Sequence, residues 1–317
     1  MRNIRIRPLL KGAATYVPGL YSFAPRRTSG AISPRYCYSV WLKHLVIAYR
    51  NGLSSLPNTV AELGPGYSLG IGLAALISGA KKYYALDVVE YSDKKKNLEV
   101  FDELIGLFQA KESVPDEREF PRAKPFLESY EFPSHILCDG LLDEALRQDR
   151  LDSIRKAVLN LDSGPHDKIE ISYFVPWHDS RMIKKESVDM ILSQAVLEHV
   201  DDLPTMYRVL YRWLKPGGFM SHQVDFGCHE TAGFWNGHWA YSDFVWKLIR
   251  GKRPYFLNRE PNSTRVRLLR DFGLDVVLDA KGTNTSGIQR EQLAPKFRKI
   301  SDDDLTTSDA LLQGTKG

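Results

Sequence analysis

Cysteine is scarce in this chain. Its 317 residues include three cysteines, Cys37, Cys138 and Cys228, which lie far apart and form no C-x-x-C pair. An odd number of widely spaced cysteines indicates neither a disulfide framework nor a zinc knuckle. The fold must therefore rest on an apolar core, and a hydrophobic content of 43% in a chain of this length is sufficient for one.

A long apolar run is also lacking. No segment approaches the roughly 20 apolar residues of a membrane span, and the basic N-terminal sequence has no continuous apolar core like that of a signal peptide. We therefore expect a cytoplasmic protein without integral membrane association. Contact of the basic start with a membrane surface is the weaker alternative.

Concentrated charge of one sign is lacking as well. The formal net charge is +4, and the few basic runs, such as Lys94–Lys96 and Lys252-Arg253, are short. No basic stripe interleaved with aromatic residues accompanies them, so they are typical of solvated faces rather than of a nucleic-acid footprint. We expect no nucleic-acid partner.

Four glycines stand in the stretch AELGPGYSLGIG, from Ala61 to Gly72. NTVAEL, which overlaps the start of this stretch, is a β-branched and apolar run that predicts a buried strand. SLGIGLAALISGA, which begins within the stretch, predicts a helix with Ser68 as N-cap and Gly79 as stop. KKYYALDVVE predicts the next strand, ending at Asp87. A strand, a glycine turn, a helix and a second strand indicate an α/β fold with parallel strands.

The same alternation resumes beyond Asp167. KIEISYFV, SVDMILS, FMSHQVDF and LDVVLDA predict strands. LPTMYRVLYRWLKPGG predicts an amphipathic helix ended by Pro216-Gly217-Gly218, STRVRLLRDFG predicts another helix, and the tail from residue 304 predicts a last edge strand. We expect a doubly wound, mostly parallel sheet of seven strands. Residues 1–55 form an N-terminal lid segment and helix, and residues 56–317 form the main domain. Residues 90–167 are a helical insertion between the second and third strands that covers the site.

The glycine turn has three interpretations. A phosphate-binding P-loop would require Gly-Lys-Ser/Thr, and no lysine is present. A dinucleotide fingerprint requires G-x-G-x-x-G, whereas Gly64, Gly66 and Gly70 are spaced G-x-G-x-x-x-G. A purely structural turn would not need so many glycines. Glu62, at the end of a buried strand, requires a partner, and a ligand that carries an ammonium group suits it better than a pyrophosphate.

Several motifs in this order resemble the class I S-adenosylmethionine-dependent methyltransferases. VAELGPGYSLG resembles their first motif, YYALD their second, and SVDMILSQAVLEHVDDL followed by LKPGGFMSHQVDF their fourth and fifth strands. The resemblance implies a Rossmann-like fold, S-adenosylmethionine as cofactor and methyl transfer. The chain is also similar to bacterial members that occur beside surface-polysaccharide genes.

The resemblance implies roles for individual residues. Glu62 lies near the cofactor's amino group, Asp87 accepts hydrogen bonds from the ribose hydroxyls, and Ser193 and Gln194 face the methionine part. The acid that often follows the third strand is not evident here, so Trp177, His178 and Asp179 are all candidates for the adenine contact, and Tyr36 or Tyr38 for a lid contact. The full set implied for the cofactor is Glu62, Gly64, Gly66, Asp87, Val88, Ser193 and Gln194, with Val89 also flanking the adenine.

Histidines near the ends of the fourth and fifth strands are the candidate proton acceptors. We predict His229 as the base, oriented by Asp225. His199 is a catalytic candidate that fits a structural cap equally well, and His222 fits a satisfied core histidine. The aromatic residues around His238 either stack on a sugar or pack the core. We predict no metal, because the ligand spacing around His229 is loose.

The favoured function is O-methylation of a small-molecule or glycan hydroxyl. An Asn-Pro-Pro-Tyr type motif, frequent in members that methylate amines of bases or glutamine, is lacking after the fourth strand. The alternatives are a catalytically silent cofactor-binding protein and a nicotinamide-dependent oxidoreductase. The acceptor and the oligomeric state cannot be predicted.

Overall fold

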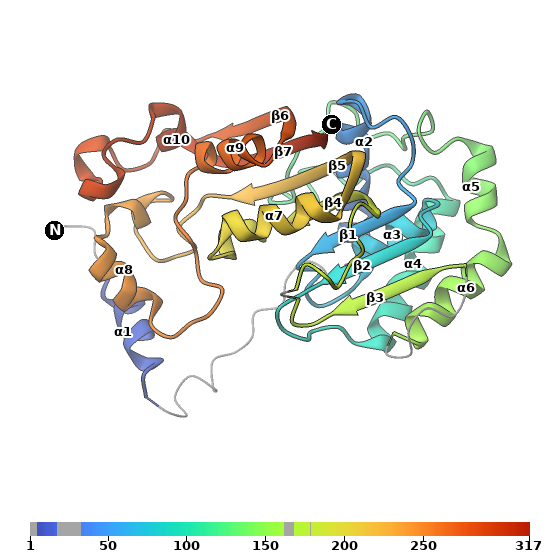
Figure 1. Cartoon of the computed structure of the whole chain (residues 1–317), viewed down its shortest axis with the longest axis horizontal. Helices are drawn as coiled ribbons and strands as arrows, with labels where there is room; N and C mark the ends of the chain where they lie inside the picture. Colours follow the sequence, from blue (N-terminus) through green and yellow to red (C-terminus); the bar gives the residue numbers. More distant parts are fainter. Residues whose placement is uncertain (1–4, 18–32, 162–167, 178) are drawn as a thin grey trace.

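A seven-stranded sheet runs through the molecule (Figure 1). The computed structural model describes residues 5–17, 33–161, 168–177 and 179–317. The strand order is β3-β2-β1-β4-β5-β7-β6, and β1 to β5 are parallel to one another. The strands are β1 (Thr59–Leu63), β2 (Lys82–Leu86), β3 (Glu170–Phe174), β4 (Val188–Gln194), β5 (Leu214–Asp225), β6 (Leu274–Thr283) and β7 (Thr307–Lys316).

The predicted doubly wound, mostly parallel sheet is confirmed, with one correction at its far side. β7 was expected at the edge, but it lies between β5 and β6 and is antiparallel to both. Its run from Ala310 to Gln313 is fully buried, whereas most of β6 is partly or fully exposed. β7 is the more buried strand although β6 contains more apolar residues, so composition alone does not indicate which of the two lies inside the sheet.

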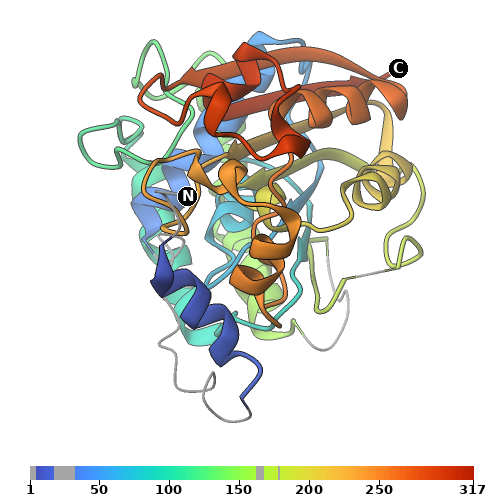
Figure 2. The same cartoon turned by 90° about the vertical axis from the view of Figure 1, so that its left-hand side faces the viewer.

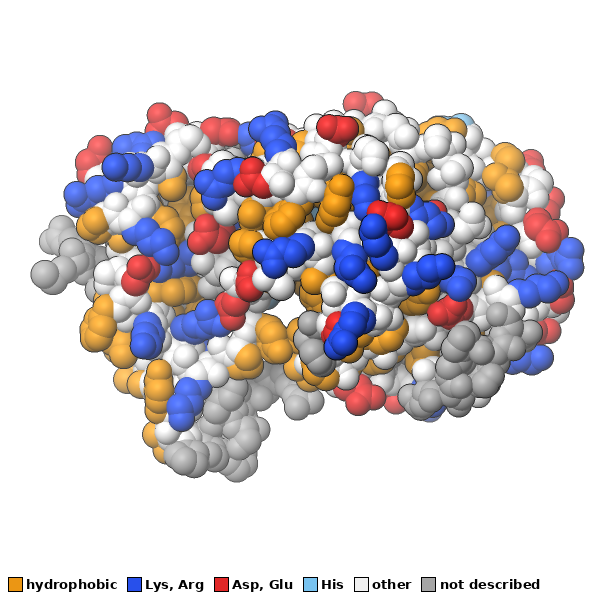
Figure 3. Space-filling model, viewed as in Figure 1, with side chains coloured by type: hydrophobic (Ala, Val, Ile, Leu, Met, Phe, Trp, Pro, Cys, Tyr) orange, Lys and Arg blue, Asp and Glu red, His pale blue; other side chains and the backbone are white. Residues whose placement is uncertain are grey.

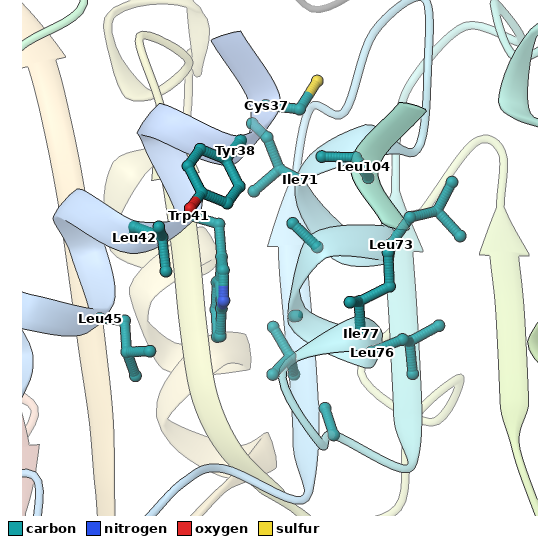
Figure 4. Close-up of a cluster of buried hydrophobic side chains, with 14 of the residues drawn as sticks. Cys37, Tyr38, Trp41, Leu42, Leu45, Ile71, Leu73, Leu76, Ile77 and Leu104 are labelled. Atoms are coloured by element: carbon teal, nitrogen blue, oxygen red, sulfur yellow. The ribbon is translucent and has the colours of Figure 1, made fainter. Parts of the chain in front are cut away.

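One face of the sheet is covered by α2 (Pro34–Arg50), α3 (Gly70–Ile77), α4 (Lys94–Gln109) and α6 (Gln148–Leu159). Ser33 caps α2 by accepting from the Tyr36 N–H, and Pro34 occupies its first turn. Figure 4 shows Tyr38 and Trp41 of α2 directed toward α3, where Ile71 lies beside them in the core. α2 is thus packed into the core, and the lid role of residues 1–55 stays a prediction.

The other face is covered by α7 (Leu203–Trp213) and α9 (Asn262–Asp271). α7 begins after Asp202, whose side chain accepts from the Thr205 N–H, and it buries Trp213 at its end. β5 follows directly from Leu214, so the Pro-Gly-Gly segment opens this strand rather than separating it from the helix.

Three helices stand between β2 and β3, namely α4, α5 (Asp139–Ala145) and α6. The long irregular segment between α4 and α5 returns to the sheet, where the Lys124 carbonyl accepts from the Gln194 side chain. Its role as a cover for the site stays a prediction. The remaining helices are α1 (Ile6–Ala14), α8 (Asp243–Arg250), α10 (Asp302–Thr306) and short 3-10 turns at Leu197–His199, Gly237–Ala240, Arg290–Gln292 and Pro295–Phe297.

Candidate active site

The glycine turn after β1 lies at the carboxyl edge of the sheet. Gly64 and Gly66 have positive φ angles of 66° and 70°, which favour glycine. A Cβ at Gly64 would lie 2.7 Å from a methyl carbon of Val196. Asp87, the residue after β2, accepts hydrogen bonds from the N–H groups of Gly66 at 3.1 Å and Val88 at 2.7 Å. Asp87 therefore holds the turn in place from the neighbouring strand.

The other two glycines make room for the protein's own side chains. A Cβ at Gly70 would lie 2.4 Å from the Cys37 sulfur, and a Cβ at Gly72 would lie 2.0 Å from the Tyr83 ring. Tyr83 is fully buried, and its hydroxyl donates to Glu62 at 2.5 Å. The absence of a side chain at Gly72 therefore lets Tyr83 reach Glu62.

Glu62 is a buried carboxyl, 2% exposed, at the floor of a cavity. Burial raises its pKa to about 8, and the neighbouring Asp87 charge acts in the same direction, against the opposing hydrogen bond from Tyr83. An ammonium group brought near this carboxyl would favour its charged form, because opposite charges attract strongly away from water. The site is thus suited to a cationic ligand group.

Two cavities of about 300 Å³ each share Gly64, Asp87 and Val196 in their walls. We call one the polar cavity, because polar groups from several elements line it, and the other the apolar cavity, because its walls are mostly apolar. An apolar cavity suits a flat aromatic ring such as a purine. The polar cavity is lined by Tyr36, Glu62, Pro65, Tyr67, Ile71, Tyr91 and Gln194, among others. The apolar cavity is lined by Leu86, Val88, Trp177, His199, Val200, Met206 and Tyr255, among others.

Ser193 and Gln194 lie differently. Gln194 lines the polar cavity, whereas Ser193 is fully buried and hydrogen-bonded to Nδ1 of His222 at 2.9 Å. Successive side chains of a strand point to opposite faces, so a pair of neighbours cannot both face one cavity. The implied contact of Ser193 with the methionine part therefore has no support from its position.

His44 of α2 was missed by the sequence reasoning. It is fully buried, and its Nε2 donates to Gln194 Oε1 at 3.1 Å while Nδ1 lies 2.7 Å from Ser221 Oγ. Burial lowers its pKa to about 4, so the ring is neutral near pH 7. Because Gln194 Nε2 donates to the Lys124 carbonyl at 2.8 Å, both ends of the Gln194 amide are held in one orientation.

The candidates for the adenine and lid contacts also separate. Trp177 lines the apolar cavity, Asp179 is paired with Arg181, and His178 lies outside the described residues. Tyr36 lines the polar cavity, whereas the Tyr38 hydroxyl is turned away and donates to the Glu112 carbonyl.

Asp225 and His229 form a pair where β5 ends. His229 Nε2 lies 3.0 Å from Asp225 Oδ2, and both side chains are partly exposed. His229 and Glu230 have φ angles of 45° and 66°, an uncommon conformation for such residues that tends to occur at functional sites. Burial alone would lower the pKa of His229, but the hydrogen bond and charge of Asp225 outweigh it, so the pKa is raised.

Glu198 and His199 lie beside this pair. The His199 and His229 ring centres are 5.4 Å apart, and burial lowers the pKa of His199 to about 4. Glu198 is 3% exposed, neither carboxyl oxygen has a hydrogen-bond partner, and burial raises its pKa to about 7. Within the described residues, Glu198, Asp225 and His229 form the one group whose potential metal-ligand atoms all lie within 4.8 Å of one another.

The aromatic residues around His238 are core residues. Trp239 and Tyr241 are 1% and 2% exposed, and the His238 ring lies 5.0 Å from that of Trp239. Burial lowers the pKa of His238 to about 3. Of the two interpretations of this cluster, the structure supports packing rather than a sugar-binding face. His222 is likewise fully buried, as predicted, but it is only half satisfied, because Nδ1 is hydrogen-bonded to Ser193 and Nε2 has no partner.

Comparison with known proteins adds a family to this geometry. Residues 169–221, which run from β3 into β5, match the methyltransferase domain family. The match spans 53 of the 317 residues and supports a methyltransferase that uses S-adenosylmethionine. The matched segment contains Gln194 and His199 but not Glu62, Asp87 or the Asp225–His229 pair. No curated protein matches the chain.

Solved structures with a similar fold are distant. A methyltransferase from Mesorhizobium loti has 13% identity and a TM-score of 0.41, covering 86% of this chain and 98% of that one. A sarcosine dimethylglycine methyltransferase from Galdieria sulphuraria has 13% identity and a TM-score of 0.43, covering 87% and 84%. A Haemonchus contortus phosphoethanolamine N-methyltransferase has 16% identity and a TM-score of 0.41, covering 87% and 53%. We draw nothing further from likenesses this weak.

The residues at the carboxyl edge fit S-adenosylmethionine. The buried Glu62 carboxyl can receive its ammonium group, and Asp87 lies where β2 ends, between the two cavities. The apolar walls around Val88 and Trp177 suit a purine ring.

Proposed function

We propose that this methyltransferase transfers the methyl group to a hydroxyl of a small molecule or glycan. The observation that carries the proposal is the Asp225–His229 pair at the end of β5, next to β4, whose Gln194 lines the polar cavity. His229 Nε2 lies 3.0 Å from the Asp225 carboxylate. A hydroxyl needs a proton acceptor as it is methylated, and a histidine held by a carboxylate supplies one. The similarity to proteins encoded beside surface-polysaccharide genes adds the glycan as a candidate acceptor.

Proton transfer follows from the hydrogen bonding of His229. Its Nε2–H donates to Asp225, so the neutral ring has Nδ1 free to accept the acceptor's proton. The imidazolium that forms is stabilised by the adjacent carboxylate. When bound, S-adenosylmethionine supplies the methyl group and the sulfonium leaving group. The protein's remaining task is to align the hydroxyl with the reacting carbon.

The cofactor roles follow from position. We infer that Glu62 receives the amino group, that Asp87 receives the ribose hydroxyls, and that Gln194 uses its fixed amide to contact the methionine part. His199 lies between the apolar cavity and His229, where its low pKa keeps it neutral, and we assign it to positioning rather than to proton transfer.

The test uses S-adenosylmethionine with a labelled methyl group and two panels of acceptors, monosaccharides and small amines. We expect label in methoxy products, identified by mass spectrometry, and a loss of about 10²- to 10⁴-fold in kcat for His229→Gln, the range that a general base contributes. His135→Gln, an exposed histidine beside Tyr49, is the matched control. Label in the amines alone, or an unchanged rate in His229→Gln, would contradict the proposal.

A further inference from the structure

Helices α1 and α8 pack closely beside the carboxyl edge of the sheet (Figures 1 and 2). A Cβ at Gly12 would lie 2.0 Å from the Leu248 carbonyl oxygen, so the two backbones touch. Beyond the helix pair, the Lys252 N–H donates to the Thr15 hydroxyl at 2.8 Å. α1 is therefore fixed on α8, and the two helices present a common outer face.

This outer face is apolar to an unusual degree. The exposed fractions are 70% for Ile6 and 64% for Leu10 on α1, and 72% for Phe244 and 41% for Leu248 on α8. Among the described residues, thirteen large hydrophobic side chains are exposed, and seven of them lie on these two segments. We call the surface formed by Ile6, Leu10, Tyr16, Val17, Phe244, Leu248 and Tyr255 the α1–α8 face.

The spacing on α1 shows why these side chains are unpartnered. Ile6, Leu10, Ala13 and Val17 follow one another at i, i+4, i+7 and i+11 and are all exposed, whereas Pro8 and Gly12 are buried against α8. The helix therefore has one apolar stripe directed away from the protein. A solvent-exposed apolar stripe indicates a binding surface, because soluble monomers seldom expose large contiguous apolar patches.

Positive charge surrounds the α1–α8 face. Residues 5–17 and 242–255 contain seven basic residues and one acidic residue, a net charge of +6, whereas the whole chain carries +4. Figure 3 shows blue side chains interspersed with orange ones at the lower left, over α1 and α8. Among the described residues, three ion pairs join these segments to the rest of the protein: Arg250 with Asp201, and Asp243 with both Arg259 and Lys296. One basic and one acidic residue of the segments are thus paired outward.

We propose that the α1–α8 face docks on the surface of an anionic lipid bilayer. Amphipathic helices with basic residues beside an apolar stripe lie in the headgroup region, with the apolar side chains inserted and the basic ones among anionic headgroups. Both features are present on one surface here. Within the described ranges, no helix has the length and apolar character to cross a bilayer, so the association is peripheral.

Charge argues against a second copy of the chain as the occupant. A two-fold interface places the same patch on both sides, so this face would bring +6 against +6. An anionic bilayer has the opposite charge and also accepts the apolar side chains. It therefore satisfies both properties of the face.

The position of the face bears on the acceptor. Tyr255, which belongs to the face, and Asp201, which pairs with Arg250, both line the apolar cavity. Docking would thus hold the apolar cavity close to the lipid surface. Resting on the proposed function, this position favours an acceptor that is carried at a membrane, such as a lipid-linked hydroxyl compound.

The test is cosedimentation of the full chain with vesicles of phosphatidylcholine alone or of phosphatidylcholine with phosphatidylglycerol. We expect binding to the anionic vesicles that weakens with salt, and a loss of about tenfold or more in Phe244→Ser/Leu248→Ser. Leu141→Ser/Leu159→Ser, two side chains that are each 49% exposed on α5 and α6, is the matched control and should bind as the wild type does.

Three results would overturn the proposal. They are no preference for anionic vesicles, equal losses in the two double variants, and a wild-type dimer that Phe244→Ser/Leu248→Ser converts to a monomer in sedimentation velocity. Thermal unfolding of each variant checks that it is folded. Vesicle binding does not require the cofactor, so its failure leaves the proposed function standing, and absence of S-adenosylmethionine binding leaves the docking surface standing.

Discussion

Gly72→Ala is a sharp test of the packing that places Glu62. The new methyl would lie 2.0 to 2.2 Å from three carbons of the Tyr83 ring, and Tyr83 is fully buried. Overpacking of this kind costs about 1–3 kcal/mol, and displacing the hydroxyl from the Glu62 carboxyl removes a hydrogen bond to a chargeable group, which contributes about 1.5–3 kcal/mol. We expect the free energy of unfolding to fall by about 2.5–6 kcal/mol, the sum of these two ranges.

The chain offers a matched control in Gly106, which lies on the exposed side of α4 with nothing within 4 Å of its ideal Cβ. Gly106→Ala should stabilise the protein by about 0.5–1 kcal/mol, because alanine loses less backbone entropy in a helix. Urea denaturation measures both variants. In a Tyr83→Ala background the added methyl at Gly72 should cost little. Similar stability for Gly72→Ala and Gly106→Ala would refute the reasoning.

Three further predictions concern the site. In Asp225→Asn the pKa of His229 should fall, because burial still lowers it and the largest raising influence, Asp225, is gone, while Glu198 and Glu230 remain. The rising limb of the kcat/KM profile should therefore move to lower pH, and an unmoved limb would exclude His229 as the base. Dialysis against EDTA should leave activity unchanged, whereas a loss restored by Mn²⁺ would make Asp225 and His229 metal ligands. His44→Leu should raise the KM for S-adenosylmethionine, because the Gln194 amide loses the hydrogen bond that orients it. The lost hydrogen bonds of the buried ring should also lower the free energy of unfolding by about 1–3 kcal/mol. An unchanged KM would show that the amide orientation is irrelevant.

Much of the sheet was predictable because its strands are short apolar runs between clear turns. Asp87 could be placed at the end of β2 because the apolar run stops there. The position of β7 could not be predicted, since sequence order does not fix which strand enters the interior. α3 starts at Gly70, one residue later than a Ser68 cap implies, although the Ser68 hydroxyl does accept from the Gly70 N–H at 3.3 Å. The Leu69 N–H donates to the Asn97 side chain of α4.

The site shows a similar division. Glu62 was singled out because an acid at the end of a buried strand needs a partner. Asp225 and His229 were chosen because they stand where the fifth strand was expected to open into the cleft, and Asp225 is indeed the last residue of β5. His44 could not be found, because its contact with Gln194 joins residues 150 positions apart. Ser193 was misjudged because the sequence shows that side chains alternate along β4 but not which face the cavity occupies.

The central claim is that the carboxyl edge of this sheet binds S-adenosylmethionine through Glu62 and Asp87. Isothermal calorimetry with S-adenosylmethionine and S-adenosylhomocysteine tests it on the wild type, Asp87→Ala and the control Asp179→Ala, an acid paired with Arg181 outside both cavities. We predict micromolar binding, about 8 kcal/mol, that weakens by at least about tenfold in Asp87→Ala and is unchanged in Asp179→Ala. Absence of binding by the wild type, or equal binding by all three proteins, would contradict the claim.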